Sequence, residues 1–137
     1  MTTKYLLCAI IALGMTGCSA LTAQNAPVNV QVALKDFQIS SSMTTFSQGV
    51  PYHFTITNNG TVAHEFMIMP PMMSMGMSME DMDKTAVAMV SEEKLPPGAT
   101  QTLDVTFKED EPQGKMEFAC HVEGHYEAGM KLPIVVQ

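Results

Sequence analysis

Residues 120–130, CHVEGHYEAGM, hold one thiol, two imidazoles and one thioether, at Cys120, His121, His125 and Met130. Thiolate, imidazole and thioether groups are ligands for soft and borderline transition metals such as copper and zinc. Four such side chains within one short stretch predict a metal site. The elements that carry the stretch decide which of the four can reach a common metal ion.

The alternation of apolar residues shows which way the side chains at the start of this stretch point. Cys120 follows Met116 and Phe118 at a period of two, so its thiol is expected on their buried face. His121 then lies on the opposite face and is expected to meet solvent. The thiol therefore points into the fold, and the neighbouring imidazole does not share its site.

A second inward imidazole comes from far upstream. His64 shares its face with Phe66 and Ile68, which alternate in the same way. His53 opposes the apolar set around Phe54 and is expected at the surface. His64 is thus predicted to join the 120–130 stretch at the ends of neighbouring strands.

The resulting donors are His64, Cys120, His125 and Met130. Two imidazoles, a thiolate and a weak axial thioether are the ligands of a blue copper site. Zinc more usually recruits further Cys or His in place of the thioether. The set therefore predicts one copper ion rather than zinc.

Short alternating segments separated by turn signals recur along the chain, and they predict an all-β, Greek-key β-sandwich. The alternation is seen at 28–34, 52–56, 66–68, 103–107, 116–120 and 134–136. Turn signals are NNG at 58–60, PPG at 96–98 and PQG at 112–114. One short helix is expected over 79–94, MEDMDKTAVAMVSEEK, with Ser78 as its N-cap.

Over residues 28–137 the sequence resembles the cupredoxins, the small blue copper proteins. Cys120, His125 and Met130 match their C-x4-H-x4-M motif, VAHEF after NNG matches the strand that carries His64, and LPPGATQTLDVTF is similar to the strand before the Cys-bearing hairpin. The spacing is like that of rusticyanin and auracyanin. The resemblance implies a cupredoxin-like sandwich with one type 1 copper held by these three residues and His64.

Two positions depart from the cupredoxin pattern. Glu65 follows the first histidine, where many cupredoxins have Asn, and Glu123 stands where a Pro usually precedes the Gly-His pair. Both changes leave the four ligands in place. They affect the hydrogen bonding around the ligands, which orients them and tunes the metal.

The N-terminal region resembles a bacterial lipoprotein signal. Residues 1–17 combine Lys4 with an apolar run too short to span a bilayer, and Cys18 is the expected lipidation site, with ordinary cleavage after Ala20 as the alternative. Residues 18–27 are then a tether and 28–137 the domain. In either case the mature protein is expected outside the cytoplasm, in the cell envelope or periplasm, with Cys120 as its one remaining folded-domain thiol.

The formal net charge is -7, from seven Lys and fourteen Asp plus Glu. Such a surface repels nucleic acid, so nucleic acid is excluded as a partner. The expected partners are redox proteins, or copper donor and acceptor proteins, with the membrane reached through the lipid anchor at Cys18.

Residues 67–82 contain eight of the fourteen methionines. Alternate thioethers at Met73, Met75, Met77 and Met79 suit auxiliary Cu(I) binding, because thioether is a soft ligand. The other reading is a flexible apolar surface or lid that docks a partner. Both readings are kept open.

Two functions follow from this sequence. The first is an electron carrier that moves single electrons between extracytoplasmic redox partners through one type 1 copper, with His125 as the exit. The second is a periplasmic copper-handling protein, a chaperone or sequestration module whose methionine-rich segment takes Cu(I). Enzymes such as nitrite reductases and multicopper oxidases need more copper ligands than four histidines provide, so an enzyme is not expected.

Overall fold

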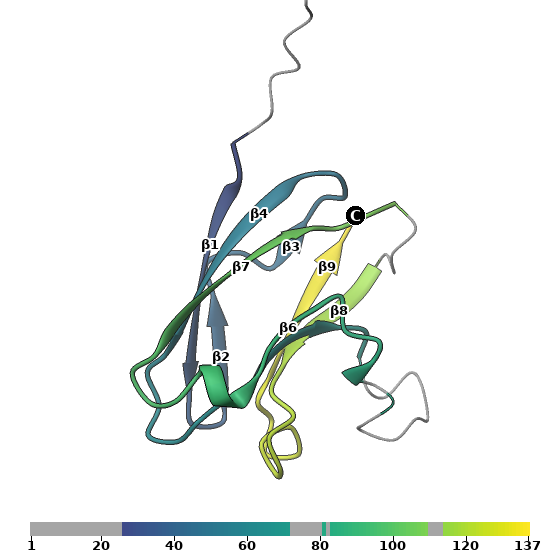
Figure 1. Cartoon of the computed structure of the whole chain (residues 1–137). Coiled ribbons are helices and arrows are strands. Elements are labelled where there is room, and N and C mark those ends of the chain that lie inside the picture. Colours follow the sequence, from purple (N-terminus) through teal and green to yellow (C-terminus); the bar gives the residue numbers. More distant parts are fainter. Residues whose placement is uncertain (1–25, 72–80, 82, 110–113) are drawn as a thin grey trace, which may run out of the picture.

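The computed structural model describes residues 26–71, 81, 83–109 and 114–137, which form two β-sheets packed face to face (Figure 1). The first sheet has the strand order β2-β1-β4-β7. Its strands are β1 (Val28–Lys35), β2 (Gln38–Ser41), β4 (Pro51–Asn58) and β7 (Thr100–Thr106). Strand β1 pairs parallel with β4 and antiparallel with β2.

The second sheet has the strand order β3-β9-β8-β5-β6. Its strands are β3 (Thr45–Phe46), β5 (Phe66–Met69), β6 (Ala88–Val90), β8 (Gly114–Ala119) and β9 (Lys131–Val136). The chain crosses repeatedly from one sheet to the other, which confirms the predicted β-sandwich. Within the described residues, no helix has the length and apolar character needed to cross a membrane.

The core lies between the sheets and follows the predicted period of two. In β4, Tyr52, Phe54 and Ile56 are buried while the residues between them are partly exposed. Phe46 of β3 lies against several core rings, with its centroid 5.7 Å from that of Phe54 and 5.8 Å from that of Phe118. Aromatic contacts of this kind contribute beyond the area they bury.

The helix predicted over 79–94 is wrong for most of its length. Residues 88–90 form β6, and Glu92–Lys94 is a single 3-10 turn. Asp81 and Asp83 have helical geometry, while residues 79, 80 and 82 lie outside the described part of the chain. The edge of β5 explains the difference: Val87 N–H donates to Ile68 O (2.8 Å), and β6 then pairs antiparallel along β5. Strand pairing satisfies this otherwise open edge.

Asn58, at the end of β4, shapes the loop that leads to His64. It is fully buried. Its Nδ2 donates to Val62 O and to Leu95 O, both at 2.8 Å, and its Oδ1 accepts from Gly60 N–H at 2.8 Å. One amide side chain therefore joins β4, the 59–65 loop and the segment before β7.

Asn58→Ala should lower the free energy of unfolding by roughly 2–4 kcal/mol, because it leaves buried backbone groups without their partner. Urea unfolding of the metal-free protein measures the change. Asn59→Ala is the matched control, since Asn59 is exposed, and it should change the value by less than about 0.5 kcal/mol. Equal effects of the two substitutions would contradict the role of Asn58.

Candidate metal centre

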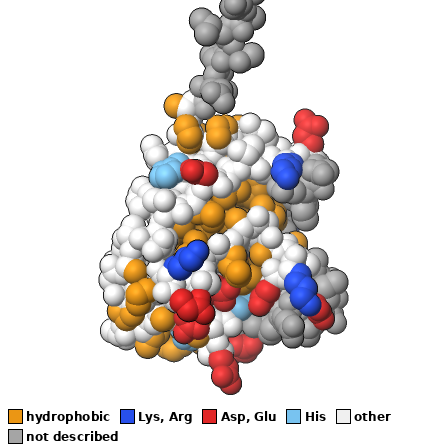
Figure 2. Space-filling model, viewed as in Figure 1, with side chains coloured by type: hydrophobic (Ala, Val, Ile, Leu, Met, Phe, Trp, Pro, Cys, Tyr) orange, Lys and Arg blue, Asp and Glu red, His pale blue; other side chains and the backbone are white. Residues whose placement is uncertain are grey.

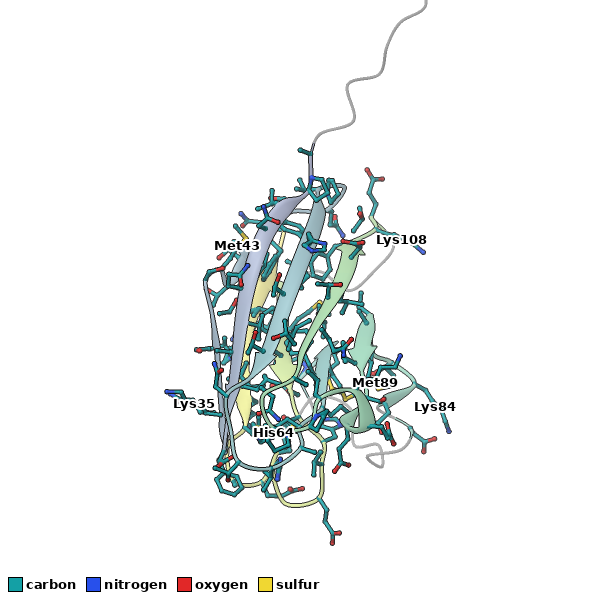
Figure 3. All side chains as sticks on the ribbon, turned by 60° about the vertical axis from the view of Figure 1, so that its left-hand side comes forward. Lys35, Met43, His64, Lys84, Met89 and Lys108 are labelled. Carbon is teal, nitrogen blue, oxygen red and sulfur yellow. The ribbon has the colours of Figure 1, made fainter. Side chains whose placement is uncertain are left out.

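Three metal-binding side chains meet at one end of the sandwich. His64 lies two residues before the start of β5, Cys120 directly follows β8, and His125 lies in the loop that joins β8 to β9. Figure 3 shows His64 at this end, enclosed by the loops that close the sandwich. Strand pairing of β5 with β8, in which Met67 faces Ala119, brings the two strand ends together.

The donor atoms of the three side chains converge. His64 Nδ1 lies 3.2 Å from His125 Nδ1, and Cys120 Sγ lies 3.4 Å from His125 Nδ1. All three donors lie within 4.8 Å of one another, and in the described part of the chain this is the one group of three or more His, Cys, Asp or Glu residues that does so. His64 and Cys120 are completely buried, whereas His125 is 8% exposed. The site is therefore dry, and of its three donors His125 reaches the surface.

Backbone hydrogen bonds close the loop from Cys120 to Met130. Cys120 N–H donates to Met130 O (3.2 Å), and Met130 N–H donates to His125 O (3.0 Å). The Met130 side chain is fully buried in the same core cluster as Cys120. The loop thus brings a thioether into the apolar surroundings of the thiol, as the predicted ligand set requires.

A carboxylate lies behind the buried histidine. His64 Nε2, the nitrogen remote from the donor cluster, is 3.4 Å from Asp36 Oδ1, longer than an ordinary hydrogen bond. Thr61 holds this carboxylate through its backbone N–H (2.8 Å) and its hydroxyl (2.7 Å). These bonds lower the pKa of Asp36, so it is negatively charged at neutral pH.

Gly60 allows the Asp36 carboxylate to approach the His64 imidazole. A Cβ at this position would lie 2.4 Å from Asp36 Oδ1 and 2.8 Å from His64 Nε2. No side chain fits there without moving the carboxylate or the imidazole. The Gly of the NNG turn is therefore required by packing at the site, and its role extends beyond the turn itself.

Burial controls the protonation of two donors. Burial, followed by the neighbouring His125, lowers the pKa of His64 below its ordinary value of 6.5. Burial also raises the pKa of the Cys120 thiol, although Glu65 N–H donates to its sulfur at 3.3 Å. The metal-free site thus holds a neutral imidazole and a protonated thiol, and a metal ion must displace the thiol proton when it binds.

Phe37 stands beside the exposed edge of the site. It is 52% exposed, and its ring lies edge-on to that of His125, with centroids 5.4 Å apart. Its backbone has φ 61°, which is rare for a residue other than glycine. An apolar ring is therefore held next to the one donor residue that reaches solvent.

The prediction that His121 meets solvent is wrong. Its side chain does face away from Cys120, but it is only 1% exposed, and its Nδ1 lies 2.7 Å from Asp83 Oδ1. Strand parity gives the face of a sheet, and here that outer face is covered by the segment that carries Asp83. His53, also expected at the surface, is 36% exposed and pairs with Asp104 at 2.6 Å.

The two departures from the cupredoxin pattern have different surroundings. Glu65 still ties the ligand loops together, because the bond to Cys120 Sγ comes from its backbone and not from its side chain. Burial, followed by the charge of Asp83, raises the pKa of the Glu65 carboxyl. Glu123 is exposed. Neither change removes a donor from the cluster.

Some predicted residues lie outside the described part of the chain. They are the signal region 1–17, the lipidation site Cys18, and the auxiliary Cu(I) candidates Met73, Met75, Met77 and Met79. Three residues at the site were missed: Asp36, Phe37 and Gly60. The Asp-Phe pair at a hairpin and the NNG turn were visible in the sequence, but their approach to His64 and His125 depends on the fold.

Solved structures with a similar architecture include auracyanins. Dithionite-reduced auracyanin from Roseiflexus castenholzii matches with a TM-score of 0.58 at 18% identity, covering 82% of this chain and 98% of its own. Auracyanin A, a "blue" copper protein from Chloroflexus aurantiacus, matches with a TM-score of 0.59 at 20% identity, covering 82% and 100%. The chain has a cupredoxin-like fold. No family model and no curated protein matches the sequence itself.

In this cupredoxin-like domain, metal-free protein should lose stability as the pH falls below about 6.5. The folded state resists protonating His64, because its pKa is lowered, while the unfolded chain takes up the proton near the ordinary value. Above that pH, His64 makes its full contribution to the free energy of unfolding. As the pH falls towards the pKa of His64 in the folded state, this contribution declines by at most about 1.4 kcal/mol per pH unit. Urea unfolding at several pH values, compared with His64→Gln, measures it. Identical pH dependence in the two proteins would contradict the assignment.

Proposed function

We propose that this protein carries single electrons between extracytoplasmic redox partners by means of one type 1 copper. The observation that supports the proposal is the convergence of two imidazole Nδ1 atoms and one cysteine sulfur, at His64, His125 and Cys120, in a buried site. These are the donor types of blue copper sites. Auracyanin A shares the fold, and it is a "blue" copper protein.

The donor set fits copper better than zinc. Thiolate and imidazole suit copper, and the buried thioether of Met130 would complete the set of residues that hold it. A structural zinc site would normally be closed by four strong ligands. Bound copper would supply a one-electron redox couple, and the surrounding residues would hold the ion and exclude water.

The protein residues exclude water and hold the donors in place. Complete burial of His64 and Cys120 keeps solvent from the thiolate. The backbone bonds of the 120–130 loop, together with the Glu65 N–H on the sulfur, restrain the donors from both sides. A restrained donor set changes little between oxidation states, which keeps the reorganisation on electron transfer small.

His125 is the proposed point of electron exit. It is the most exposed of the three donor residues, and the Phe37 ring beside it offers a partner an apolar contact. Exposed Glu123 and Glu127 lie in the same loop, and acidic side chains are seen at this end of the molecule in Figure 2. A partner with a basic rim around an apolar centre would match this surface.

The proposed location is outside the cytoplasm, with a lipid anchor at Cys18. The apolar run before that residue and the small residue Gly17 support this part of the proposal. The tether of residues 18–27 would then place the domain near a membrane surface. Redox proteins of the envelope are the matching class of partner.

Copper reconstitution tests the proposed function. The Cu(II) form should be strongly blue through thiolate-to-copper charge transfer and should show a reversible one-electron wave in voltammetry. Cys120→Ser should remove the colour, whereas His53→Gln should keep it, because His53 lies outside the donor cluster and is partly exposed. A colourless Cu(II) protein, or a blue colour that survives Cys120→Ser, would rule out the type 1 site.

Asp36→Asn should raise the reduction potential of the copper-loaded protein by tens of millivolts. The negative carboxylate near His64 favours the more positive Cu(II) state, and the substitution removes this charge. Protein-film voltammetry measures the shift. Asp104→Asn is the matched control, because this carboxylate also contacts a histidine, His53, outside the donor cluster. Equal potentials in wild type and Asp36→Asn would contradict the assigned influence.

A further inference from the structure

The outer face of the second sheet carries a buried cluster that is separate from the core between the sheets. Its members are Met67, Met69, Ala119 and Tyr126, and the two methionine side chains are completely buried. The pairing of β5 with β8 explains the arrangement, because Met67 faces Ala119 and Met69 faces Glu117. Two thioethers are therefore held, shielded from solvent, on the side of the sheet opposite the cysteine.

His121 stands at one end of this cluster. Its ring packs edge-on against that of Tyr126, with centroids 5.2 Å apart and an interplanar angle of 85°. Tyr126 in turn is fixed by its hydroxyl, which donates to Glu117 at 2.6 Å. The imidazole thus continues the face that carries the two thioethers.

One nitrogen of His121 has no hydrogen-bond partner among the residues that the structure describes. The side chain is 1% exposed, and this nitrogen, Nε2, is buried. Buried polar atoms are almost always paired, so an unpaired one needs an explanation. His64 Nε2 also lacks a hydrogen bond within the described residues, but it lies 3.4 Å from a carboxylate.

The contact at Nδ1 of His121 leaves Nε2 free to act as a metal ligand. Asp83 Oδ1 lies 2.7 Å from His121 Nδ1. A carboxylate at that distance holds the ring proton on Nδ1, and the lone pair is then on Nε2. Carboxylate, imidazole and metal in this order are the usual arrangement around metal-binding histidines.

The surroundings favour a cation with soft ligand preferences. Glu65 is close enough to interact electrostatically with both Asp83 and His121. His121 also borders a hollow with Glu123, Gly124 and Glu127, which offers cations a route from solvent. Thioether and imidazole select Cu(I) over Mg²⁺ or Ca²⁺, which take oxygen ligands.

We propose that His121 Nε2, together with the thioethers of Met67 and Met69, forms a second metal site for Cu(I) or its analogue Ag(I). The site is distinct from the His64, Cys120 and His125 centre. Cys120 and His121 are neighbours in the chain whose side chains point to opposite faces of the sheet, so the two sites lie back to back. Such a site would let the protein hold Cu(I) as well as transfer electrons.

Ag(I) titration followed by NMR tests this site residue by residue. The protein is the full chain carrying Cys120→Ser, so that thiolate binding at the first centre does not compete, with its methionine methyl groups labelled with ¹³C. Met67→Leu and Met69→Leu assign the two methyl signals and conserve side-chain volume. The first equivalents of Ag(I) should shift both methyl signals and the His121 imidazole signals.

Variants separate this site from other silver binding. His121→Ala should remove the Met67 and Met69 shifts, and Asp83→Asn should weaken them about tenfold in affinity by releasing the imidazole. His53→Ala is the matched control, since His53 also has a carboxylate on its Nδ1 but is 36% exposed, and it should leave the shifts unchanged. If His121→Ala fails to fold, Met67→Leu should still weaken the His121 shift.

Several results would overturn the proposal. The Met67 and Met69 signals could stay unmoved in excess Ag(I), or could move equally in His121→Ala. Shifts confined to methionines 72–79 would place soft-metal binding in that segment instead. The blue colour of the copper-loaded, unsubstituted protein is a separate signal, so loss of the electron-carrier function and loss of this site can be told apart.

Discussion

The hydrogen bond from Glu65 N–H to Cys120 Sγ joins the two loops on which the metal centre depends. One loop follows β4 and carries His64, and the other follows β8 and carries His125. Burial raises the pKa of this thiol, and the bond from the Glu65 backbone acts in the opposite direction. The centre therefore tolerates a glutamate at position 65, because the side chain is not the group that connects the loops.

The same end of the sandwich is organised by polar groups that would be costly if they were left unpaired. Asn58 of β4 is fully buried, and its side chain is bonded to backbone groups of two other segments. Asp36 is fixed by Thr61, and Gly60 gives it room to approach His64. Buried and constrained polar groups of this kind specify one arrangement, since each alternative breaks several bonds at once. The donors are thus positioned before any metal binds.

The sequence was sufficient to predict the sandwich and the grouping of His64, Cys120 and His125, because the patterns behind both are local. Alternation at a period of two located the core strands, and the types and spacing of Cys120 and His125 identified the chemistry. The short strands β2 and β3 gave too little pattern to detect. The helix expected over 79–94 failed because pairing with the β5 edge outweighed the local helical pattern. Asp36 and Phe37 were missed because their contacts join segments that are distant in sequence.

The error at His121 carries the most information about the molecule. Strand parity assigned the correct face, and a solvent-exposed imidazole would have needed no further explanation. A buried imidazole needs an explanation, because burial removes water from both ring nitrogens. Within the described residues, Asp83 replaces that water at only one of them. Two thioethers on the same face are poor hydrogen-bond acceptors but good ligands for soft metals. The unpaired nitrogen is therefore better understood as a metal ligand than as a packing residue, and the outer face of the sheet as a second functional surface.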